Sequence, residues 1–342
     1  FDQGDASMRD LLGGKGAGLS QMTKIGLPVP PGFVITTEAC LEYFQSDGKW
    51  PANLWEEIKT NIKQLESTIG RSFGSNNTPL LLSVRSGSRI SMPGMMDTIL
   101  NLGINDDIVG GISQMMGDER PAHDAYRRLL QKYAEVVMDI PAHHFEDILT
   151  NNKSIAGIQL DHELSTADLK TIIHEFKDLI RDKTSTDVPV DPWIQLRGAV
   201  EAVFKSWNNP RAIYYRNHQR IPHNIGTAVT IMAMVFGNVG NDSGTGVLFT
   251  RNPATGANEL YGEYLSNAQG EDVVAGIRTP EPIANLKHAN PVLYNQIAEI
   301  ADRLENHYKD VQDVEFTVEH ENLFILQTRS AKRNAHAATK TA

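Results

Sequence analysis

The sequence predicts an α+β protein in which two mixed lobes flank a helical segment. Strand and turn signals occupy residues 1–105, and strand signals return after about residue 225. Between them, residues 106–205 show helical spacing of apolar side chains throughout. The chain has 342 residues and is 40% apolar, which is enough for two or three folding units. We therefore expect an N-terminal lobe at 1–105, a helical subdomain at 106–205 and a C-terminal lobe at 206–342.

Individual elements follow from local patterns. In the N-terminal lobe we expect buried strands at 32–36 and 80–84, with a helix at 54–69 between them. In the helical segment, Ser165 and Asp168 have the spacing of a capping box that opens a helix through residue 180, and a second helix covers 193–207. In the C-terminal lobe a helix is expected at 292–309 and strands at 227–235, 245–250, 259–265, 314–318 and 323–328.

Charge and cysteine content exclude several classes of protein. The formal net charge of -10 argues against nucleic-acid binding, which needs clustered Lys and Arg. The single cysteine, Cys40, permits no disulfide within the chain and fits a reducing compartment. It is either a reactive nucleophile or, as free cysteines more often are, a small buried filler. No run approaches the ~20 apolar residues that span a bilayer. We expect a cytoplasmic protein, or an organellar one if a targeting peptide precedes Phe1.

Two neighbouring strand patterns near the C-terminus carry four polar side chains. Alternation along a strand places Asp313 and Glu315 on one face, and Gln327 and Arg329 likewise. A three-residue loop at 320–322 would set Glu315 opposite Gln327 and Asp313 opposite Arg329, whereas a two-residue loop would break this match. The apolar residues expected on the other face are Val314, Phe316 and Leu326.

These oxygen-bearing groups suit Mg²⁺, which shares carboxylate ligands with substrate phosphates. The candidate metal ligands are Asp313, Glu315 and Gln327. Arg329 could pair with Asp313 or reach a phosphate. The alternative is an ordinary half-exposed hairpin closed by a salt bridge.

Two glycine-containing segments in the N-terminal lobe could contact phosphates. Residues 12–18 (LGGKGAG) combine exposed backbone N–H groups with the charge of Lys15, without the spacing of a Walker A motif. A glycine turn leading into a helix is the alternative. Arg85 ends a buried strand, where a charge needs an anionic partner. The loop after it, with two glycines and three methionines at 86–98, has the composition of a mobile phosphate-covering flap.

A third glycine-rich segment lies in the C-terminal lobe. Residues 240–246 (GNDSGTG) are expected to form a tight hairpin between the strands at 227–235 and 245–250, or to touch phosphates through their backbone. The eleven histidines are scattered and show no zinc spacing.

Taken together, these segments resemble the N-terminal nucleotide-binding domain of the pyruvate phosphate dikinase family, and the resemblance runs through essentially the whole chain. It is carried by residues 11–17 (LLGGKGA), 83–87 (SVRSG), 91–98 (SMPGMMDT), 243–247 (SGTGV), 267–274 (NAQGEDVV) and 327–329 (QTR). The 92–98 stretch (MPGMMDT) favours this family over the related phosphoenolpyruvate synthases.

The resemblance implies an ATP-grasp fold, in which ATP lies between two α+β lobes, here with a helical insert. It implies that Lys15, Arg85 and Arg329 act on the ATP phosphates and that Gly94 contributes from the flap. Asp313, Glu315 and Gln327 would hold Mg²⁺ and the triphosphate. Gln269 is expected near the nucleotide, and Thr227 on the strand beside the adenine.

The same resemblance implies a reaction that this chain cannot complete alone. The family passes a pyrophosphoryl group from ATP to a histidine on a swivelling domain, uses inorganic phosphate, and serves pyruvate in a distant barrel. No stretch here resembles the phosphohistidine motif, so we expect those domains as separate partners, and the resemblance allows a homodimeric parent enzyme. The alternatives are a non-catalytic nucleotide-binding or interdomain module and the ATP domain of a phosphoenolpyruvate synthase or another related dikinase.

Overall fold

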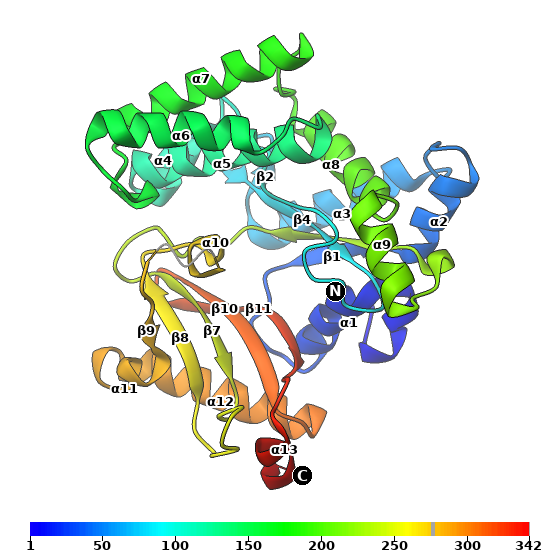
Figure 1. Cartoon of the computed structure of the whole chain (residues 1–342), viewed down its shortest axis with the longest axis vertical. Coiled ribbons are helices and arrows are strands. Elements are labelled where there is room, and N and C mark those ends of the chain that lie inside the picture. The colour runs from blue at the N-terminus through cyan, green and yellow to red at the C-terminus, as the bar shows by residue number, and fades with distance from the viewer. Residues whose placement is uncertain (275–277, 342) are drawn as a thin grey trace. The chain divides into compact units, whose positions relative to one another are not determined.

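A computed structural model describes residues 1–274 and 278–341, so residues 275–277 and 342 of the expected C-terminal lobe lie outside it. The chain forms two compact units. The first contains Phe1 and residues 7–17 and 31–234, and the second contains residues 2–6, 18–30 and 235–342. Both units mix helices with strands, which confirms the α+β class (Figure 1). The division into three functional lobes stays a prediction.

The first unit contains an antiparallel sheet of four strands in the order β1-β6-β4-β5. The strands are β1 (Gly32–Ile35), β4 (Leu82–Gly87), β5 (Thr98–Leu102) and β6 (Ala228–Ala233). β6 comes from the range that we expected in the C-terminal lobe, yet it lies between β1 and β4. All six residues of β6 are buried, as expected for a central strand. A two-stranded parallel pair, β2 (Ser72–Phe73) and β3 (Pro79–Leu80), completes the strands of this unit, so the expected strand at 80–84 is split at Leu81.

Helices account for the rest of the first unit. They are η1 (Ala6–Met8), whose first residue belongs to the second unit, α1 (Arg9–Lys24), which continues into the second unit, α2 (Thr37–Gln45), α3 (Leu54–Ile69), α4 (Val109–Met116), α5 (Glu119–Val137), α6 (His143–Ala156), η2 (Asp161–Glu163), α7 (Thr166–Thr184), α8 (Pro192–Ser206), α9 (Pro210–Gln219) and η3 (His223–Ile225). α3 has the predicted limits, and α8 agrees within one residue. The Ser165–Asp168 capping box is present, with each side chain accepting from the other residue's backbone N–H, and α7 extends four residues beyond the expected end.

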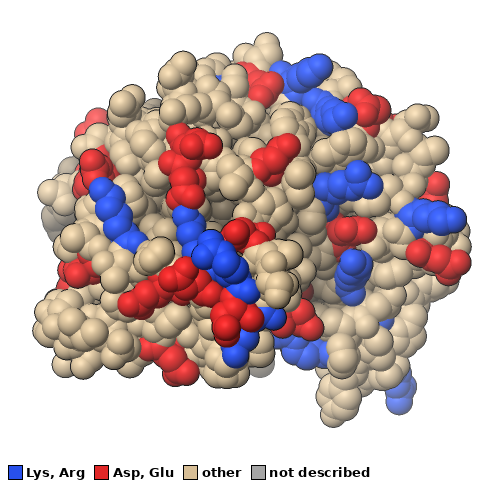
Figure 2. Space-filling view, turned by 90° about the horizontal axis from the view of Figure 1, so that it is seen from above, with Lys and Arg blue, Asp and Glu red and all other residues tan. Residues whose placement is uncertain are grey.

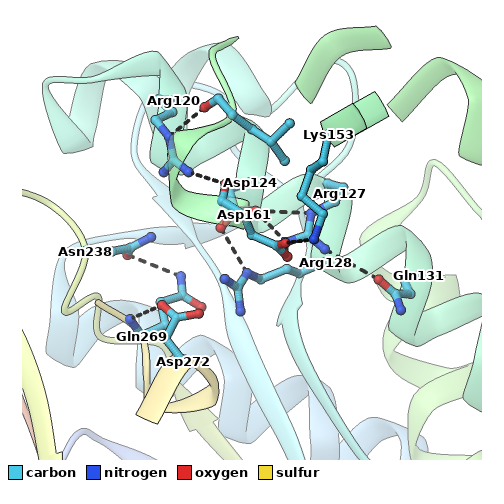
Figure 3. A network of polar contacts seen from close by, with 11 residues as sticks. Arg120, Asp124, Arg127, Arg128, Gln131, Lys153, Asp161, Asn238, Gln269 and Asp272 are labelled. Carbon is cyan, nitrogen blue, oxygen red and sulfur yellow. Dashed lines mark hydrogen bonds and ion pairs between the residues drawn. The ribbon is translucent and has the colours of Figure 1, made fainter. Parts of the chain in front are cut away.

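A buried ionic network joins α5 to α6 and η2 in the helical part of the first unit (Figure 3), with Arg127 Nη2 3.5 Å from Asp161 Oδ2 as the link. Asp124 accepts bonds from Arg127 Nη2 at 2.7 Å and from Arg128 Nε at 2.9 Å. Asp161, beyond α6, pairs with Lys153 at 2.9 Å. Burial alone would raise the pKa of Asp124, but the guanidinium groups of Arg128 and Arg127 outweigh it and hold the pKa below its usual range.

Charges on the surface are mixed in sign. On the face shown in Figure 2, Lys and Arg side chains are interspersed with Asp and Glu. α7 provides examples, with Lys170 3.0 Å from Glu119 and Arg181 2.9 Å from Asp187. Exposed pairs of this kind contribute little stability, about 0–1 kcal/mol each.

The second unit is built on a five-stranded antiparallel sheet in the order β11-β10-β7-β8-β9. Its strands are β7 (Gly244–Phe249), β8 (Tyr261–Ser266), β9 (Glu281–Pro282), β10 (Gln312–Glu319) and β11 (Asn322–Ser330). The remaining elements are α10 (Gly270–Val274), η4 (Ile283–Asn285), α11 (Leu286–Ala289), α12 (Pro291–Tyr308) and α13 (Ala335–Thr341).

α12 covers one face of this sheet (Figure 1). Ile297, Ile300 and Leu304 on the helix surround one apolar cluster together with the strand residues Leu248, Val314, Phe316 and Ile325. Because strand side chains alternate, the residues between these positions point to the other face. Core packing thereby decides which side chains of β7, β10 and β11 remain on the open face.

The glycine-rich segment 240–246 does not form the expected hairpin, because β6 and β7 belong to different sheets. It supports another turn instead. Ser243 Oγ accepts the N–H of His320 at 3.0 Å, and the carbonyl of Asp242 accepts the N–H of Glu321 at 3.0 Å. Sequence adjacency favoured a hairpin, but the pairing of β6 was decided by contacts with distant strands.

The β10–β11 turn also differs from the expectation. His320 and Glu321 alone connect the strands, both at positive φ (47° and 65°), so the loop has two residues rather than three. The register nevertheless shifts between Glu315 and Phe316, and this β-bulge leaves Leu326 as the extra residue. Leu326 is half-buried, whereas Leu323 and Ile325 occupy the core face.

No helix in the described residues is long and apolar enough to cross a membrane.

Candidate functional site

The glycine-rich segment of the first unit is a kink inside α1, not a turn before a helix. Gly13 has φ 67° and ψ 172°, which interrupts the helical geometry. A Cβ at this position would lie 1.8 Å from the carbonyl oxygen of Gly87, so only glycine permits this approach of α1 to the end of β4. The next residue, Gly14, donates its N–H to Ser88 O at 2.9 Å.

This kink places Lys15 over the end of β4. Lys15 Nζ donates to the carbonyl of Ser86 at 3.0 Å, and its Cβ is 3.6 Å from the ideal Cβ position of Gly87. Arg85 is half-buried on the same strand, two residues before Gly87. The predicted phosphate-binding residues Lys15 and Arg85 are therefore brought together by α1 and β4 within one unit.

The central strand β6 and the residue before it add two threonines, Thr230 and Thr227, beside this corner. Thr230 pairs in register with Arg85, and its buried hydroxyl has no hydrogen-bond partner within the part of the chain that the structure describes. Thr227, by contrast, is engaged: its Oγ1 accepts the N–H of Gly87 at 3.2 Å and donates to Ala228 O at 3.0 Å. The structure thus gives Thr227 a role in joining β6 to β4, and its contact with a nucleotide stays a prediction.

The flap predicted after Arg85 connects β4 to β5. Gly94 lies in an exposed turn with φ 70°, and a Cβ there would meet no atom within 4 Å. The flanking Met92 is 5% exposed because it packs into a cluster with Trp207, Ala212 and Ile221. The flap therefore presents a bare backbone at its tip while its methionines anchor it.

On the second unit, the open face of the sheet carries the predicted metal ligands. The registers of β8, β7, β10 and β11 align Glu263, Val247, Glu315 and Gln327 in one row. The neighbouring row contains Asp313 and Arg329 side by side. The predicted pairing of Glu315 with Gln327 and of Asp313 with Arg329 is confirmed, although the bulge at Leu326 produces it rather than a three-residue loop.

Hydrogen bonds fix these side chains. Gln327 Nε2 donates to Glu315 Oε1 at 3.1 Å, and Arg329 Nε donates to Asp313 Oδ2 at 2.8 Å. The side chain of Asp313 is 15% exposed, whereas that of Arg329 is 53% exposed. Arg329 therefore contacts Asp313 while about half of its side chain is open to solvent.

Gln269 lies in the same unit at the start of α10. It is 6% exposed, its Nε2 donates to Asn238 Oδ1 at 3.2 Å, and its backbone N–H donates to Asp272 Oδ2 at 2.9 Å (Figure 3). These bonds hold the polar turn before α10. They do not link Gln269 to the row of Glu315 and Gln327.

The donor set of the second unit fits a magnesium ion better than a transition metal. No group of three or more His, Cys, Asp or Glu able to hold a metal occurs among residues 1–274 and 278–341. Mg²⁺ does not need such a cage, because it takes one or two carboxylates and completes its shell with water and substrate phosphates. Asp313, Glu315 and Gln327 supply only oxygen atoms for this purpose.

Sequence reasoning missed two features of the site. Thr230 was contained in a predicted strand, but nothing in the pattern marked it as the register partner of Arg85. Glu263 was contained in the strand expected at 259–265, but its alignment with Glu315 through Val247 depends on two strand pairings. Contacts between distant strands were needed to find both.

Comparison with known proteins gives a consistent result. The family described as "Pyruvate phosphate dikinase, AMP/ATP-binding domain" matches residues 9–50, 46–299 and 285–342. The chain is 51% identical over 343 residues to pyruvate, phosphate dikinase of Clostridium symbiosum, covering 100% of this chain and 39% of that protein. It is 52% identical over 340 residues to the chloroplastic enzyme of Mesembryanthemum crystallinum, covering 99% and 36%. The corresponding figures for Rhizobium meliloti (strain 1021) are 50% over 352 residues, 99% and 39%.

These matches define the class of the chain as a nucleotide-binding domain. The chain belongs to the family of pyruvate phosphate dikinase AMP/ATP-binding domains. It spans less than two fifths of the length of these curated relatives.

Proposed function

We propose that this chain is the Mg-ATP-binding part of a pyruvate phosphate dikinase, with the ATP-grasp fold, and that it donates a pyrophosphoryl group to a histidine on a separate domain. Inorganic phosphate and pyruvate would be the further substrates of the whole enzyme. The observation that carries the proposal is the row on the open sheet face, where Glu315 and Gln327 are held 3.1 Å apart beside Asp313 and Arg329.

The first unit would contribute the cationic groups. In a pyrophosphoryl transfer, the histidine nitrogen bonds to the β-phosphorus while the bond from that phosphorus to the bridging α,β-oxygen breaks and AMP leaves. Negative charge develops on the phosphate oxygens, and the protein's task is to neutralise and align them. Lys15 and Arg85 would do this from the end of β4, and the backbone of Gly94 would contribute from the flap.

The second unit would contribute the metal-binding groups. Glu315, Gln327 and Asp313 would hold Mg²⁺, which neutralises charge on the phosphate oxygens when bound. Arg329 would exchange or share its contact with Asp313 for a phosphate oxygen. Gln269 and Thr227 remain candidates for contacts with the nucleotide, the latter beside the adenine.

Transfer to a separately produced phosphohistidine domain tests this function. The chain, Mg-ATP labelled at the β-phosphorus and the histidine domain of a relative are mixed, and label on the histidine domain is measured. We expect transfer by the wild-type chain and loss of at least about 100-fold in the double variant Arg85→Ala/Glu315→Ala, because removing one transition-state donor commonly costs 10²–10³.

Matched controls exclude a general effect of altered charge. The first control is Lys24→Met, because Lys24 lies on the same helix as Lys15 and its side chain is 58% exposed. The second control is Glu321→Gln, because Glu321 lies in the β10–β11 turn. Both controls should transfer label like the wild type. Labelling that survives in the double variant would show that the assigned site is wrong. Binding of Mg-ATP without any transfer by the wild type would support a non-catalytic module instead.

A further inference from the structure

The flap between β4 and β5 is attached at both of its ends to other elements of the first unit. At its base, Gly14 donates to Ser88 O at 2.9 Å, and Arg89 pairs with Asp10 at 2.8 Å. At its far side, Met92 packs into the cluster of Trp207, Ala212 and Ile221, with Met95 and Met96 against it. Between these attachments, residues 89–91 are exposed, and so is the tip at Pro93 and Gly94.

The cluster that receives the methionines is itself rigidly built. Arg216 is completely buried, its guanidinium lies 4.0 Å from the centre of the Trp207 ring, and it donates to Trp207 O. Its Nε also donates to His223 Nδ1 at 3.0 Å, and Trp207 Nε1 donates to His223 O at 3.0 Å. These contacts join the end of α8, α9 and η3 around Trp207, and the flap packs against this group of elements.

One side chain joins this support to the flap backbone. Asn209 caps α9 by accepting the N–H of Ala212 at its Oδ1, at 2.7 Å. Its Nδ2 donates to the carbonyl oxygen of Met95 at 3.2 Å, one residue after Gly94. The side-chain amide of Asn209 therefore has two separate tasks. Its oxygen caps the N-terminus of α9, and its nitrogen hydrogen-bonds to the backbone of Met95, the residue after the flap tip.

Arg211, two residues after Asn209 in the first turn of α9, adds a second polar contact: its Nη2 lies 3.6 Å from Asp97 Oδ1 at the end of the flap. Burial raises the pKa of the Asp97 carboxyl, and the charge of Arg211 opposes that rise. The flap thus meets the start of α9 through two polar contacts and three methionines.

We propose that Asn209 is a positioning residue for nucleotide binding, which fixes the flap so that the backbone at Gly94 can contact the terminal phosphates of ATP. This inference rests on the proposed function. It predicts a selective effect: losing the Asn209 Nδ2–Met95 O bond should weaken binding of a nucleotide with terminal phosphates and spare one that lacks them.

Asn209→Asp separates the two tasks of this residue. Aspartate and asparagine are comparable N-caps, so α9 keeps its capping acceptor, whereas the donor to Met95 O is replaced by a carboxylate oxygen. The chain offers a matched control in Asn290→Asp, since Asn290 also precedes a proline and caps α12 by accepting the N–H of Leu293 at 3.1 Å. Both variants of the full chain should melt at similar temperatures.

The measurement is calorimetric affinity for Mg-ATP and for AMP. We expect Asn209→Asp to weaken Mg-ATP binding roughly tenfold, while the affinity for AMP changes less than about twofold. The size of the loss is that of one hydrogen bond, because the carbonyl oxygen of Met95 loses its donor. Asn290→Asp should leave both affinities unchanged. Equal losses for ATP and AMP, or no loss for either, would overturn the inference.

Two further outcomes are distinguished by the same experiment. A wild-type chain that binds neither nucleotide overturns the proposed function and this inference with it. If the aspartate variant does not fold, Asn209→Ser provides a capping oxygen but no donor that reaches Met95 O, and the same selective loss is expected of it. A serine variant with wild-type ATP affinity would overturn the inference.

Discussion

Replacement of Gly13 by alanine tests the close approach of α1 to β4. The added Cβ would lie 1.8 Å from Gly87 O, and the φ and ψ of Gly13 (67°, 172°) are almost confined to glycine. The backbone conformation alone should cost about 1–3 kcal/mol for alanine. Displacing Gly87 to relieve the overlap should add about 1–3 kcal/mol. We therefore expect the first unit to lose roughly 4 kcal/mol of its free energy of unfolding.

A second glycine separates the two contributions. Gly70, at the end of α3, has φ 73° and would present a new Cβ to no atom within 4 Å. Gly70→Ala should therefore cost only the left-handed conformation, about 1–2 kcal/mol. All four tryptophans lie between residues 50 and 207, inside the first unit, so tryptophan fluorescence during urea unfolding reports on this unit alone.

The result that would refute the reasoning is a Gly13→Ala variant no less stable than Gly70→Ala. A second consequence is functional. Movement of Gly87 also shifts the neighbouring Ser86 carbonyl, which accepts the Lys15 ammonium at 3.0 Å, so Mg-ATP affinity should fall in Gly13→Ala and not in Gly70→Ala.

Three further predictions follow from buried groups. Cys40 is fully buried, and burial raises its pKa to about 11. A thiol reagent at pH 8 should therefore label Cys40 only as the first unit unfolds. Immediate labelling of the native chain would contradict this prediction. Phe316→Ala should destabilise the second unit by about 3–5 kcal/mol in calorimetry, whereas half-buried Phe324→Ala should cost clearly less, and equal losses would argue against the described core. Folding lowers the pKa of Asp124. Its contribution to the free energy of unfolding is therefore complete above the ordinary carboxyl pKa, and it is lost as the pH falls through the pKa of Asp124 in the folded state. Asp124→Asn should thus be less stable by about 3–5 kcal/mol at pH 7, with a gap that narrows below pH ~4; a constant gap would show that the ion pairs do not stabilise the fold.

Local patterns predicted the helices well. α3 has the expected limits because its apolar spacing is strong and Gly70 ends it in a left-handed C-cap. α7 begins where the Ser165–Asp168 pair predicted, since a capping box is a local interaction of side chains with the adjacent backbone.

Strand pairing was less predictable because it depends on distant segments. The 240–246 segment has the composition of a hairpin, but β6 pairs with β1 and β4, which lie far away in the sequence. The pairing of Glu315 with Gln327 was predicted correctly for a reason that was wrong. A two-residue turn combined with a bulge at Leu326 yields the same facing residues as a three-residue loop, and composition does not distinguish the two.

The grouping of the candidate site residues was predictable where residue types were distinctive, while their chemical role stays a prediction. Acidic residues, an amide and an arginine on two adjacent strands indicated a metal and phosphate site, and the structure brings them to one sheet face. The partners that hold the flap were not predictable in this way. Asn209 reads in the sequence only as the N-cap before a proline, and its bond to Met95 joins residues more than a hundred positions apart.

The most direct measurement of the central claim is the affinity of three chains for ATP, with and without Mg²⁺. The two variants each carry one carboxylate-to-amide change in the same β-hairpin, Glu315→Gln on strand β10 and Glu321→Gln in the β10–β11 turn. Wild type and Glu321→Gln should bind Mg-ATP equally, whereas Glu315→Gln should bind it at least roughly tenfold more weakly and should be unchanged without the metal. A Glu315→Gln chain that binds Mg-ATP as tightly as the Glu321→Gln control would contradict the assignment of this sheet face to magnesium and ATP.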